Sequence, residues 1–295
     1  FTEIQGHTSI DGRDFLKPGR QLGQPNKNIS LTIEPEIYIE NSSANSLNIR
    51  PFFRYDSVDS KRTHLDFREA YGLFFGEAGN SHWELRVGID RVFWGVTESR
   101  HLVDIINQTD LVAHPDGTNK MGQPMAHLSW INSKGTFELF ALPYFRERTF
   151  PGRQGRLRSA PLVDSQQSTF ESAAKHQHLD IASRYSNSFD NLDIGITWFE
   201  GTSREPTFSL GADQFGSPVL IPNYHQIRQF GIDAQFITGA WLLKTEYYWR
   251  EGELNAVSLE EDYFATVSGF EYILYNFCDT SLDVNLMLEN RAGRS

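Results

Sequence analysis

Alternation of apolar and polar residues with a period of two is the feature that most constrains what this chain can fold into. In the stretch 76–116, a short turn leads into a segment whose alternate residues are Trp83, Leu85, Val87 and Ile89, and the residues between them are polar or small. This pattern is typical of a β-strand with one apolar and one polar face. The segment runs into a long connection, and the same unit of turn, strand and loop returns along the chain.

The repeated alternation predicts about thirteen antiparallel strands and almost no helix. The predicted strands are 2–11, 29–40, 47–56, 64–75, 83–94, 123–131, 136–149, 177–187, 191–200, 227–238, 241–251, 263–277 and 282–290. Strand 64–75 departs from the pattern, because Glu69 falls on the apolar side between Phe67 and Tyr71. This departure indicates either a β-bulge or a position near a rim.

The lengths of the strands and of their connections favour a membrane barrel. The predicted strands have roughly nine to fourteen residues, whereas strands in general centre on about five or six. Outer-membrane strands have about 9–11 residues and are joined alternately by tight turns and long loops. Long loops are expected here at about 96–120, 150–174 and 201–225. Since the bilayer excludes open sheet edges, we predict an all-β fold, a single antiparallel up-and-down transmembrane β-barrel domain over residues 1–295, in the bacterial outer membrane.

The direction of the strands predicts where the chain ends lie. If the long loops are external, the first strand runs outward from the periplasm, and the thirteenth strand also ends outside. Complete bacterial barrels usually have an even number of strands, with both ends in the periplasm. We therefore expect several further C-terminal strands beyond Ser295.

The composition of the chain limits the classes of molecule that it can bind. The net charge of −11 argues against nucleic acid, which requires a basic surface. The single cysteine, Cys278, allows neither an internal disulfide nor a cysteine metal cluster. His176 and His178 share one side of a predicted strand, but no third metal ligand lies near them, so we expect no metal and no cofactor. The expected partners are outer-membrane lipid and small polar solutes.

Charged residues fill the faces that would line the barrel. Such a density would be prohibitive in a soluble core but is natural in a water-filled lumen. The candidate lumen and constriction residues are Arg50, Arg54, Arg68, Glu84, Arg86, Asp90, Glu98, Arg100, His101, Asp104, Arg146, Arg148, Arg184, Lys244, Glu246 and Arg250. Further acids on the same faces are Glu34, Glu36, Asp66, Glu138, Asp180, Asp193 and Asp233. The alternative is that these charges pair across neighbouring strands as a structural ladder.

The loop 96–120 carries an apolar pattern of its own. Leu102, Val103, Ile105 and Ile106 are spaced like one side of a short helix. We expect this loop to fold into the lumen and narrow it, and the polar residues of its first part would then line the constriction. The alternative is a surface loop with a hydrophobic anchor.

Three segments carry a resemblance to a known family. They are 93–110 (FWGVTESRHLVDIINQTD), 145–152 (FRERTFPG) and 201–206 (GTSREP). With them the chain resembles an uncharacterised proteobacterial family of outer-membrane β-barrels that are similar to porins. The resemblance implies a fold and a location, but neither a substrate nor catalytic residues.

Three functions remain open from the sequence. The first is a channel for passive diffusion of small polar solutes through a charged lumen. The second is an outer-membrane enzyme, such as a hydrolase, with an acid/base site at the rim; we expect no catalytic residues, because no nucleophile motif supports it. The third is a plugged structural or adhesive barrel in which the interior charges pair completely. The sequence fixes neither the solute, nor the sign of ion selectivity, nor the oligomeric state.

Overall fold

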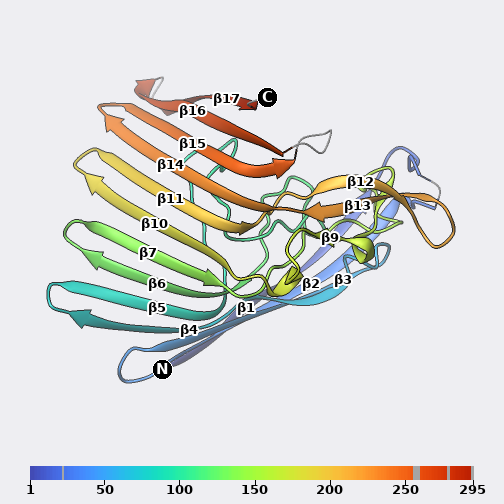
Figure 1. The fold of residues 1–295 in the computed structure, drawn as a ribbon, viewed down its shortest axis with the longest axis horizontal. Coiled ribbons are helices and arrows are strands. Elements are labelled where there is room, and N and C mark those ends of the chain that lie inside the picture. The colour runs from blue at the N-terminus through green and yellow to red at the C-terminus, as the bar shows by residue number, and fades with distance from the viewer. Residues whose placement is uncertain (22, 255–259, 278–279, 294–295) are drawn as a thin grey trace.

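The computed structural model describes residues 1–21, 23–254, 260–277 and 280–293, and it is dominated by one 13-stranded antiparallel sheet (Figure 1). Its strands are β1 (Thr2–Asp14), β2 (Lys27–Glu40), β3 (Ser46–Asp56), β4 (His64–Ala78), β5 (Ser81–Asp90), β6 (Gln123–Asn132), β7 (Gly135–Leu142), β10 (Asp180–Phe189), β11 (Leu192–Thr202), β14 (Gln226–Thr238), β15 (Trp241–Leu254), β16 (Glu260–Phe277) and β17 (Thr280–Gly293). Each strand pairs with the next one along this order. The thirteen predicted strands are therefore confirmed, and no helix among the described residues is long and apolar enough to cross a membrane.

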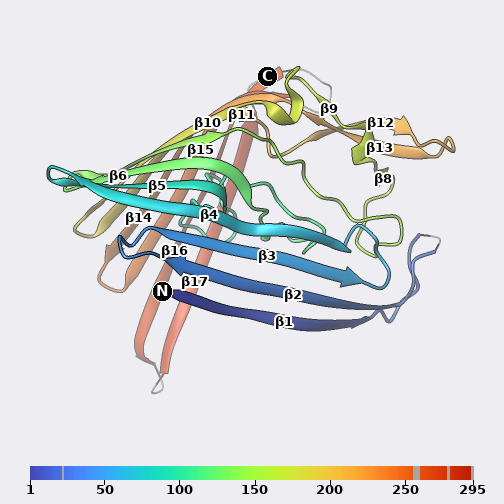
Figure 2. The ribbon, with the colours of Figure 1, turned by 90° about the horizontal axis from the view of Figure 1, so that it is seen from below.

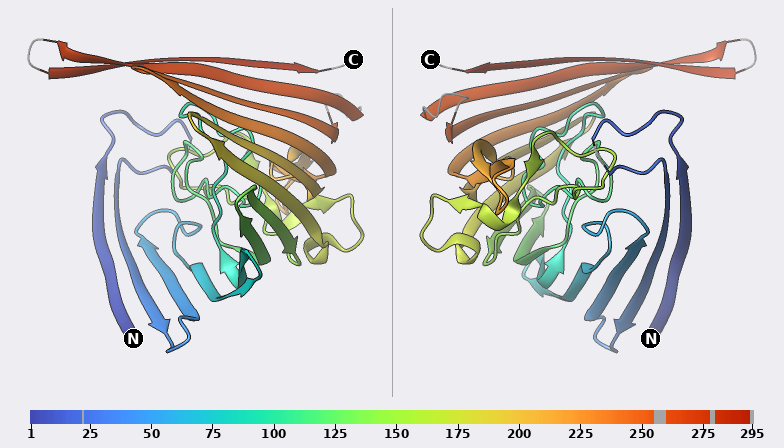
Figure 3. Two further views of the ribbon diagram at one scale, coloured as in Figure 1. Left: turned by 90° about the vertical axis from the view of Figure 1, so that its left-hand side faces the viewer. Right: turned by 90° about the vertical axis from the view of Figure 1, so that its right-hand side faces the viewer.

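The sheet has two different ends. The tight turns gather at one end, here called the turn end, and the long connections gather at the other, the loop end (Figure 1). Seen from the turn end, the sheet curves into an open horseshoe with β1 and β17 at its two edges (Figure 3). Figure 2 shows β1 to β3 as one side of this horseshoe, facing the strands β14 to β17. The curvature creates a concave face, and the connection between β5 and β6 lies on that face (Figure 3).

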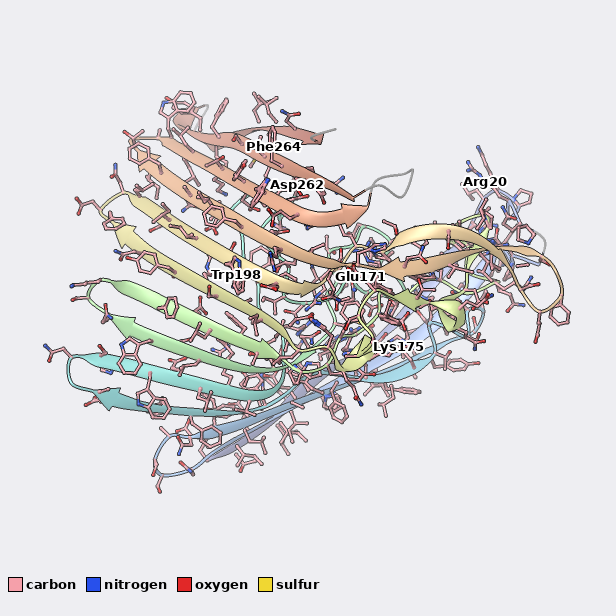
Figure 4. The ribbon with its side chains drawn as sticks, in the orientation of Figure 1. Arg20, Glu171, Lys175, Trp198, Asp262 and Phe264 are labelled. Carbon is pink, nitrogen blue, oxygen red and sulfur yellow. The ribbon has the colours of Figure 1, made fainter. Side chains whose placement is uncertain are left out.

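Apolar residues cover the convex face. One exposed apolar side chain from each of eleven strands illustrates this: Ile33, Phe53, Phe67, Val87, Trp130, Leu139, Ile181, Ile196, Phe230, Leu243 and Phe264. Figure 4 shows Trp198 and Phe264 on this face, on β11 and β16. A soluble protein does not expose an apolar surface that extends over a whole sheet, whereas a barrel in lipid does.

Polar and charged residues occupy the concave face. Buried examples are Thr32, Asn48, Arg68, Gln123, His127, Asp180, Thr197, Gln229, Asp233, Glu246 and Arg250. The predicted division is thus confirmed: Leu85 and Val87 do not lie in a dry centre, and Glu246 does not lie in bulk solvent.

A β-bulge in β4 corrects the predicted faces of this strand. Arg50 pairs with Glu69 whereas Pro51 pairs with Phe67, so that Arg68 is the extra residue. Phe67 stays on the convex face, and Arg68 and Glu69 both turn inward, which explains why Glu69 broke the alternation. Beyond the bulge the parity is reversed. The interpretation of Tyr71, Leu73 and Phe75 as outward-facing was therefore wrong, since their partners across β5 belong to the polar face.

Several strand boundaries also differ from the prediction, and the strand predicted as 83–94 already ends at Asp90. β7 ends at Leu142 rather than continuing to 149, because Pro143 has no N–H to donate to the ladder. Phe145, which lies within the predicted strand 136–149, is instead fully buried in the loop region against Tyr224. The strand predicted from 177 begins at Asp180, after a short 3-10 turn, η2 (Lys175–Gln177).

The connections at the loop end contain a second, small sheet. It consists of the hairpin β12 (Thr207–Ala212) and β13 (Pro218–Tyr224), with β8 (Leu162–Val163) and β9 (Thr169–Phe170) parallel to β13. The 3-10 turn η1 (Ser165–Gln167) joins β8 to β9. The segments 150–174 and 201–225 were expected to be plain loops, but their short strands pair with each other over a long sequence separation.

We predict that a charge on the convex face destabilises the fold. Leu139→Arg places a guanidinium where lipid is expected, and the loss should approach about 2–4 kcal/mol if the site lies near the bilayer midplane. Asp193→Arg is the matched control, because Asp193 is exposed and shares the face of Gln235 and Gly195 on the concave side. Urea unfolding in lipid vesicles measures the loss of unfolding free energy for both variants. Equal losses for the two variants would contradict the assignment of the faces.

Candidate functional site

The connection 91–122, here called the inserted loop, enters the concave space of the sheet. Val103 and Ile106 are fully buried (0% exposed), and they belong to one apolar cluster with residues of the inner wall. The members of this cluster are Trp94, Val103, Ile105, Ile106, Met125, Phe140, Leu142, Ala182, Phe199 and Ile227. The predicted inward fold is confirmed, although residues 91–122 form no helix.

The inner wall contains an apolar patch against which this loop packs. Phe140 and Leu142 on β7 and Phe199 on β11 occupy positions of the concave face, where polar residues are otherwise the rule. Full burial of an aliphatic or aromatic side chain contributes about 1.5–3 kcal/mol. One side of the loop is thus held to β6–β14 by apolar contact, and the other side is left facing the remaining concave space.

Glu246 on β15 fixes the tip of the inserted loop. Its carboxylate accepts hydrogen bonds from the backbone N–H groups of Val96, Thr97, Leu102 and Val103, at 2.5–3.3 Å, and from the Thr97 hydroxyl at 2.7 Å. Glu246 is fully buried. A buried carboxylate requires such donors, and hydrogen bonds to a charged group are stronger than neutral ones.

Gly95 permits this close approach. Its φ is +130°, and a Cβ placed there would lie 2.8 Å from Oε1 of Glu246. Two residues before Glu246 on the same strand, Lys244 forms ion pairs with Glu98 of the loop and with Glu271, the latter at 2.6 Å. Neighbouring inward positions of β15 therefore bind the same part of the loop with opposite charges.

The second half of the loop is held by other wall residues. Arg68, the bulged residue of β4, donates to Asp110 at 3.0 Å, and Asp110 also accepts from the Thr149 hydroxyl. Burial acts to raise the pKa of Asp110, but Arg68 and these hydrogen bonds outweigh it and hold the pKa below its usual value. In contrast, burial raises the pKa of Asp104, although Lys120 lies 3.3 Å from its carboxylate.

Arginines in the segment 143–158 connect the loops at the loop end. Arg146 donates to the carbonyl of Gly122 at 2.7 Å, where the inserted loop ends, and to Asp66 of β4. Arg153 pairs with Asp213 in the β12–β13 turn, and Arg156 donates to a carbonyl of the β1–β2 connection at 2.8 Å. Because Arg146, Arg153 and Arg156 each bind a different element, this segment connects the loops at the loop end.

Most of the predicted interior charges form pairs. Representative pairs are Arg50–Glu34 at 2.6 Å, Arg86–Asp90 at 3.3 Å, Arg184–Asp233 at 2.6 Å and Arg250–Glu253 at 2.7 Å. Glu84 lies 4.0 Å from Arg86, and Arg54 donates to the Thr32 hydroxyl. The alternative, pairing across neighbouring strands, therefore holds for pairs such as Arg50–Glu34 and Lys244–Glu271, whereas Arg86–Asp90 and Arg250–Glu253 each lie within one strand.

A polar cavity of about 860 Å³ lies between the inserted loop and the strands β15–β17. Six of the sixteen candidate residues line it, and these are Glu98, Arg100, His101, Asp104, Arg148 and Arg250. Within the described part of the chain, the other ten candidates lie elsewhere on the wall or beneath the loop. The cavity also includes Phe93, Lys120, Arg204, Glu205 and Tyr248, which the sequence analysis did not select.

Buried ion pairs outside the candidate set support the wall of this cavity. Arg204 donates to Asp180 at 2.7 Å and to the Ile106 carbonyl at 3.1 Å, and so links β10 to the inserted loop. The only signal for Arg204 in the sequence was its place in the resembling segment 201–206. Glu253 was missed as well, because it follows the Gly252 irregularity at the end of β15, where the alternation no longer applies.

Several histidines among the residues described contact carboxylates but do not gather into a metal cluster. No group of three potential metal ligands occurs there; His176 contacts Glu147 at 3.3 Å, and His178 contacts Asp180. Ser129, His127 and Glu138 do meet on the inner wall, but the serine and the glutamate both contact Nε2 of His127. A catalytic triad needs them on opposite ring nitrogens.

Removal of the Glu246 carboxylate is predicted to release the loop tip. Glu246→Ala leaves several buried N–H groups without an acceptor, which should cost about 2–3 kcal/mol or more. Trypsin should then cleave the folded variant at Arg100. Glu84→Ala is the control, since Glu84 has only a 4.0 Å contact to Arg86. If the Glu246 variant and the control resist trypsin equally, Glu246 does not hold the loop tip.

The Arg68–Asp110 contact predicts a component of acid sensitivity. The pKa of Asp110 in the fold lies below its ordinary value of 3.8. The stabilisation is therefore present above pH 3.8 and is lost as the pH falls through the lowered pKa. Unfolding free energies of the wild type and Asp110→Asn should converge toward acid pH. A difference that stays constant over this range would contradict the prediction.

Comparisons with known proteins agree on the fold. No family model matches this sequence, and no curated protein matches it either. OmpT, an outer membrane protein of Vibrio cholerae, in its in-vitro folded trimer form, is similar over 99% of this chain and 80% of its own, with a TM-score of 0.52 and 10% identity. OmpT expressed in the outer membrane gives a TM-score of 0.50 and 9% identity, over 99% of this chain and 76% of its own. The chain thus has the fold of outer-membrane β-barrels, which supports the predicted location in the bacterial outer membrane.

Proposed function

We propose that this protein is a porin-like channel for passive diffusion of small polar solutes across the bacterial outer membrane. The observation that carries the proposal is the two-sided inserted loop. Its apolar side is bound to the inner wall, and its polar side faces a cavity of about 860 Å³. The resemblance of three sequence segments to a porin-like family is in agreement.

The anchoring of the loop favours a fixed sieve over a moving gate. Glu246 and Lys244 hold its first half, and Arg68 and Arg204 hold its second half. A loop attached at both halves keeps a constant position in the lumen. Solutes would then be selected by the size and charge of the space beside the loop, where Glu98, Arg100 and His101 lie.

The extensive ion pairing is compatible with this proposal. Arg184 on β10 pairs with Asp233 on β14 across Gly195 of the intervening strand β11, and such pairs stiffen the wall. A plugged barrel would need the pairing and packing to extend across the whole interior, but the space between the loop and β15–β17 is hollow. We therefore favour the channel over the plugged structural barrel.

An enzymatic function has less support from the geometry. Among the loop residues that could supply an acid/base site, Glu98 is bound to Lys244, Asp104 to Lys120, and His101 packs edge-on against Phe93 at 4.7 Å. These groups face different partners rather than a common point, which an acid/base pair would require.

Conductance of the full-length protein in planar bilayers tests the proposal. We expect stable open channels in the wild type. Deletion of residues 96–103 should raise the conductance and admit larger sugars in liposome swelling, because it removes the part of the loop held by Glu246. Heat-modifiable migration on gels verifies that each variant is folded. Folded wild-type protein that carries no current would refute the channel.

A further inference from the structure

One arginine at the cavity differs from the others in its contacts. The basic residues that line the cavity are Arg100, Lys120, Arg148, Arg204 and Arg250. Lys120 is paired with Asp104, Arg204 with Asp180, and Arg250 with Glu253. Arg148 has no ion pair within 4 Å among the described residues.

The guanidinium of Arg148 keeps two nitrogens available. Its Nε donates a long hydrogen bond of 3.4 Å to Oε1 of Gln108, and its backbone N–H donates to the Tyr224 hydroxyl. Nη1 and Nη2 have no partner in the part of the chain that the structure covers. Burial lowers the pKa of Arg148, and Arg250 adds to this effect, whereas Glu205 opposes it.

The surroundings hold Arg148 in place. Gln108 is fully buried, and its Nε2 also lacks a partner among the described residues. Tyr224, which receives the backbone N–H, packs against the buried Phe145 at 5.0 Å between ring centroids. A guanidinium that is fixed in advance loses less conformational freedom when it binds a ligand.

We propose that Arg148 forms an anion-binding subsite in the wall of the channel, for solutes that carry a carboxylate or phosphate group. The proposal rests on the channel function proposed above and specifies its solutes. A guanidinium presents parallel N–H donors that match two oxygens of such a group. Chloride, a single atom, lacks the two separate acceptor oxygens that match these parallel donors.

Glu205 sets the strength of the subsite. It lines the same cavity, its side chain is 52% exposed, and its carboxylate lies 3.8 Å from Nη1 of Arg250. Its negative charge also acts to raise the pKa of Arg148, against the effect of burial. An incoming anion would be repelled by this carboxylate, so Glu205 and Arg148 should have opposite effects on anion binding.

The test measures single-channel current in potassium chloride while inorganic phosphate or succinate is added. In the wild type, at least one of the two should reduce the current with saturation. Arg148→Gln should raise the half-saturating concentration about tenfold, as expected for loss of charge-assisted hydrogen bonds. Arg148→Lys should retain part of the effect, and Glu205→Gln should lower the half-saturating concentration.

Arg158→Gln is the matched control. Arg158 lies in the same arginine-rich segment, but its guanidinium donates only to the carbonyls of Arg153 and Ser159, and it does not line the cavity. Its replacement should leave the current reduction unchanged.

The outcomes separate the two proposals. Absence of any wild-type current refutes the channel itself. A conducting wild type whose response to both anions is unaffected by Arg148→Gln refutes the subsite alone. If Arg148→Gln does not fold, Glu205→Gln provides the test. An unchanged half-saturating concentration of the anion in Glu205→Gln would also overturn the subsite.

Discussion

The sheet places its apolar side chains on the convex face and its charges on the concave face, and every other feature of the molecule depends on this inversion. In water such an arrangement would expose the residues that normally form a core and bury groups that require solvation. In a bilayer the same arrangement is favourable, because the antiparallel ladders satisfy the backbone of the strands between the two edges, β1 and β17, and the charges face away from lipid. The fold thus defines both the location of the protein and the nature of its interior.

A hydrated interior explains how a long connection can lie inside the sheet. The inserted loop has few regular backbone hydrogen bonds of its own, so its polar groups need partners. Glu246 supplies acceptors to four backbone N–H groups, while Arg68 and Arg204 supply donors to its second half. The arginines of segment 143–158 extend the same principle to the other loops. Charged side chains in this molecule therefore form hydrogen bonds with backbone groups as well as ion pairs with opposite charges.

The sequence predicts the strands well because period two is a local property. Each strand shows its own faces, and the alternation of turns and loops follows directly. The predictions fail where the alternation is interrupted locally or where a segment pairs with residues far away in the sequence. The bulge at Arg68 reversed the parity of Tyr71 and Leu73, and Pro143 ended β7 early. The hairpin β12–β13 arises from short strands that alternation does not reveal.

The candidate site could be predicted only in part. The apolar residues of the inserted loop were visible in the sequence. Phe140, Leu142 and Phe199 also stand on a face that is otherwise polar, and this pattern could have indicated where the loop packs. The attachment of the loop was not visible, because Glu246 binds residues that lie 143–150 positions earlier in the chain. Which inward charges pair and which remain available, as Arg148 does, depends on neighbours that only the fold brings together.

Accessibility along β5 tests the inverted arrangement most directly. Spin labels at positions 84, 85, 86, 87 and 89, in full-length protein with Cys278 replaced by Ser and reconstituted in lipid, report contact with oxygen dissolved in lipid or with a water-soluble nickel chelate; Gly88 is left unlabelled because it has no room for a side chain. The account predicts strict alternation, with oxygen contact at Leu85 and Val87 and chelate contact at Glu84 and Arg86. Uniform access of the chelate, or alternation of the opposite phase, would contradict it.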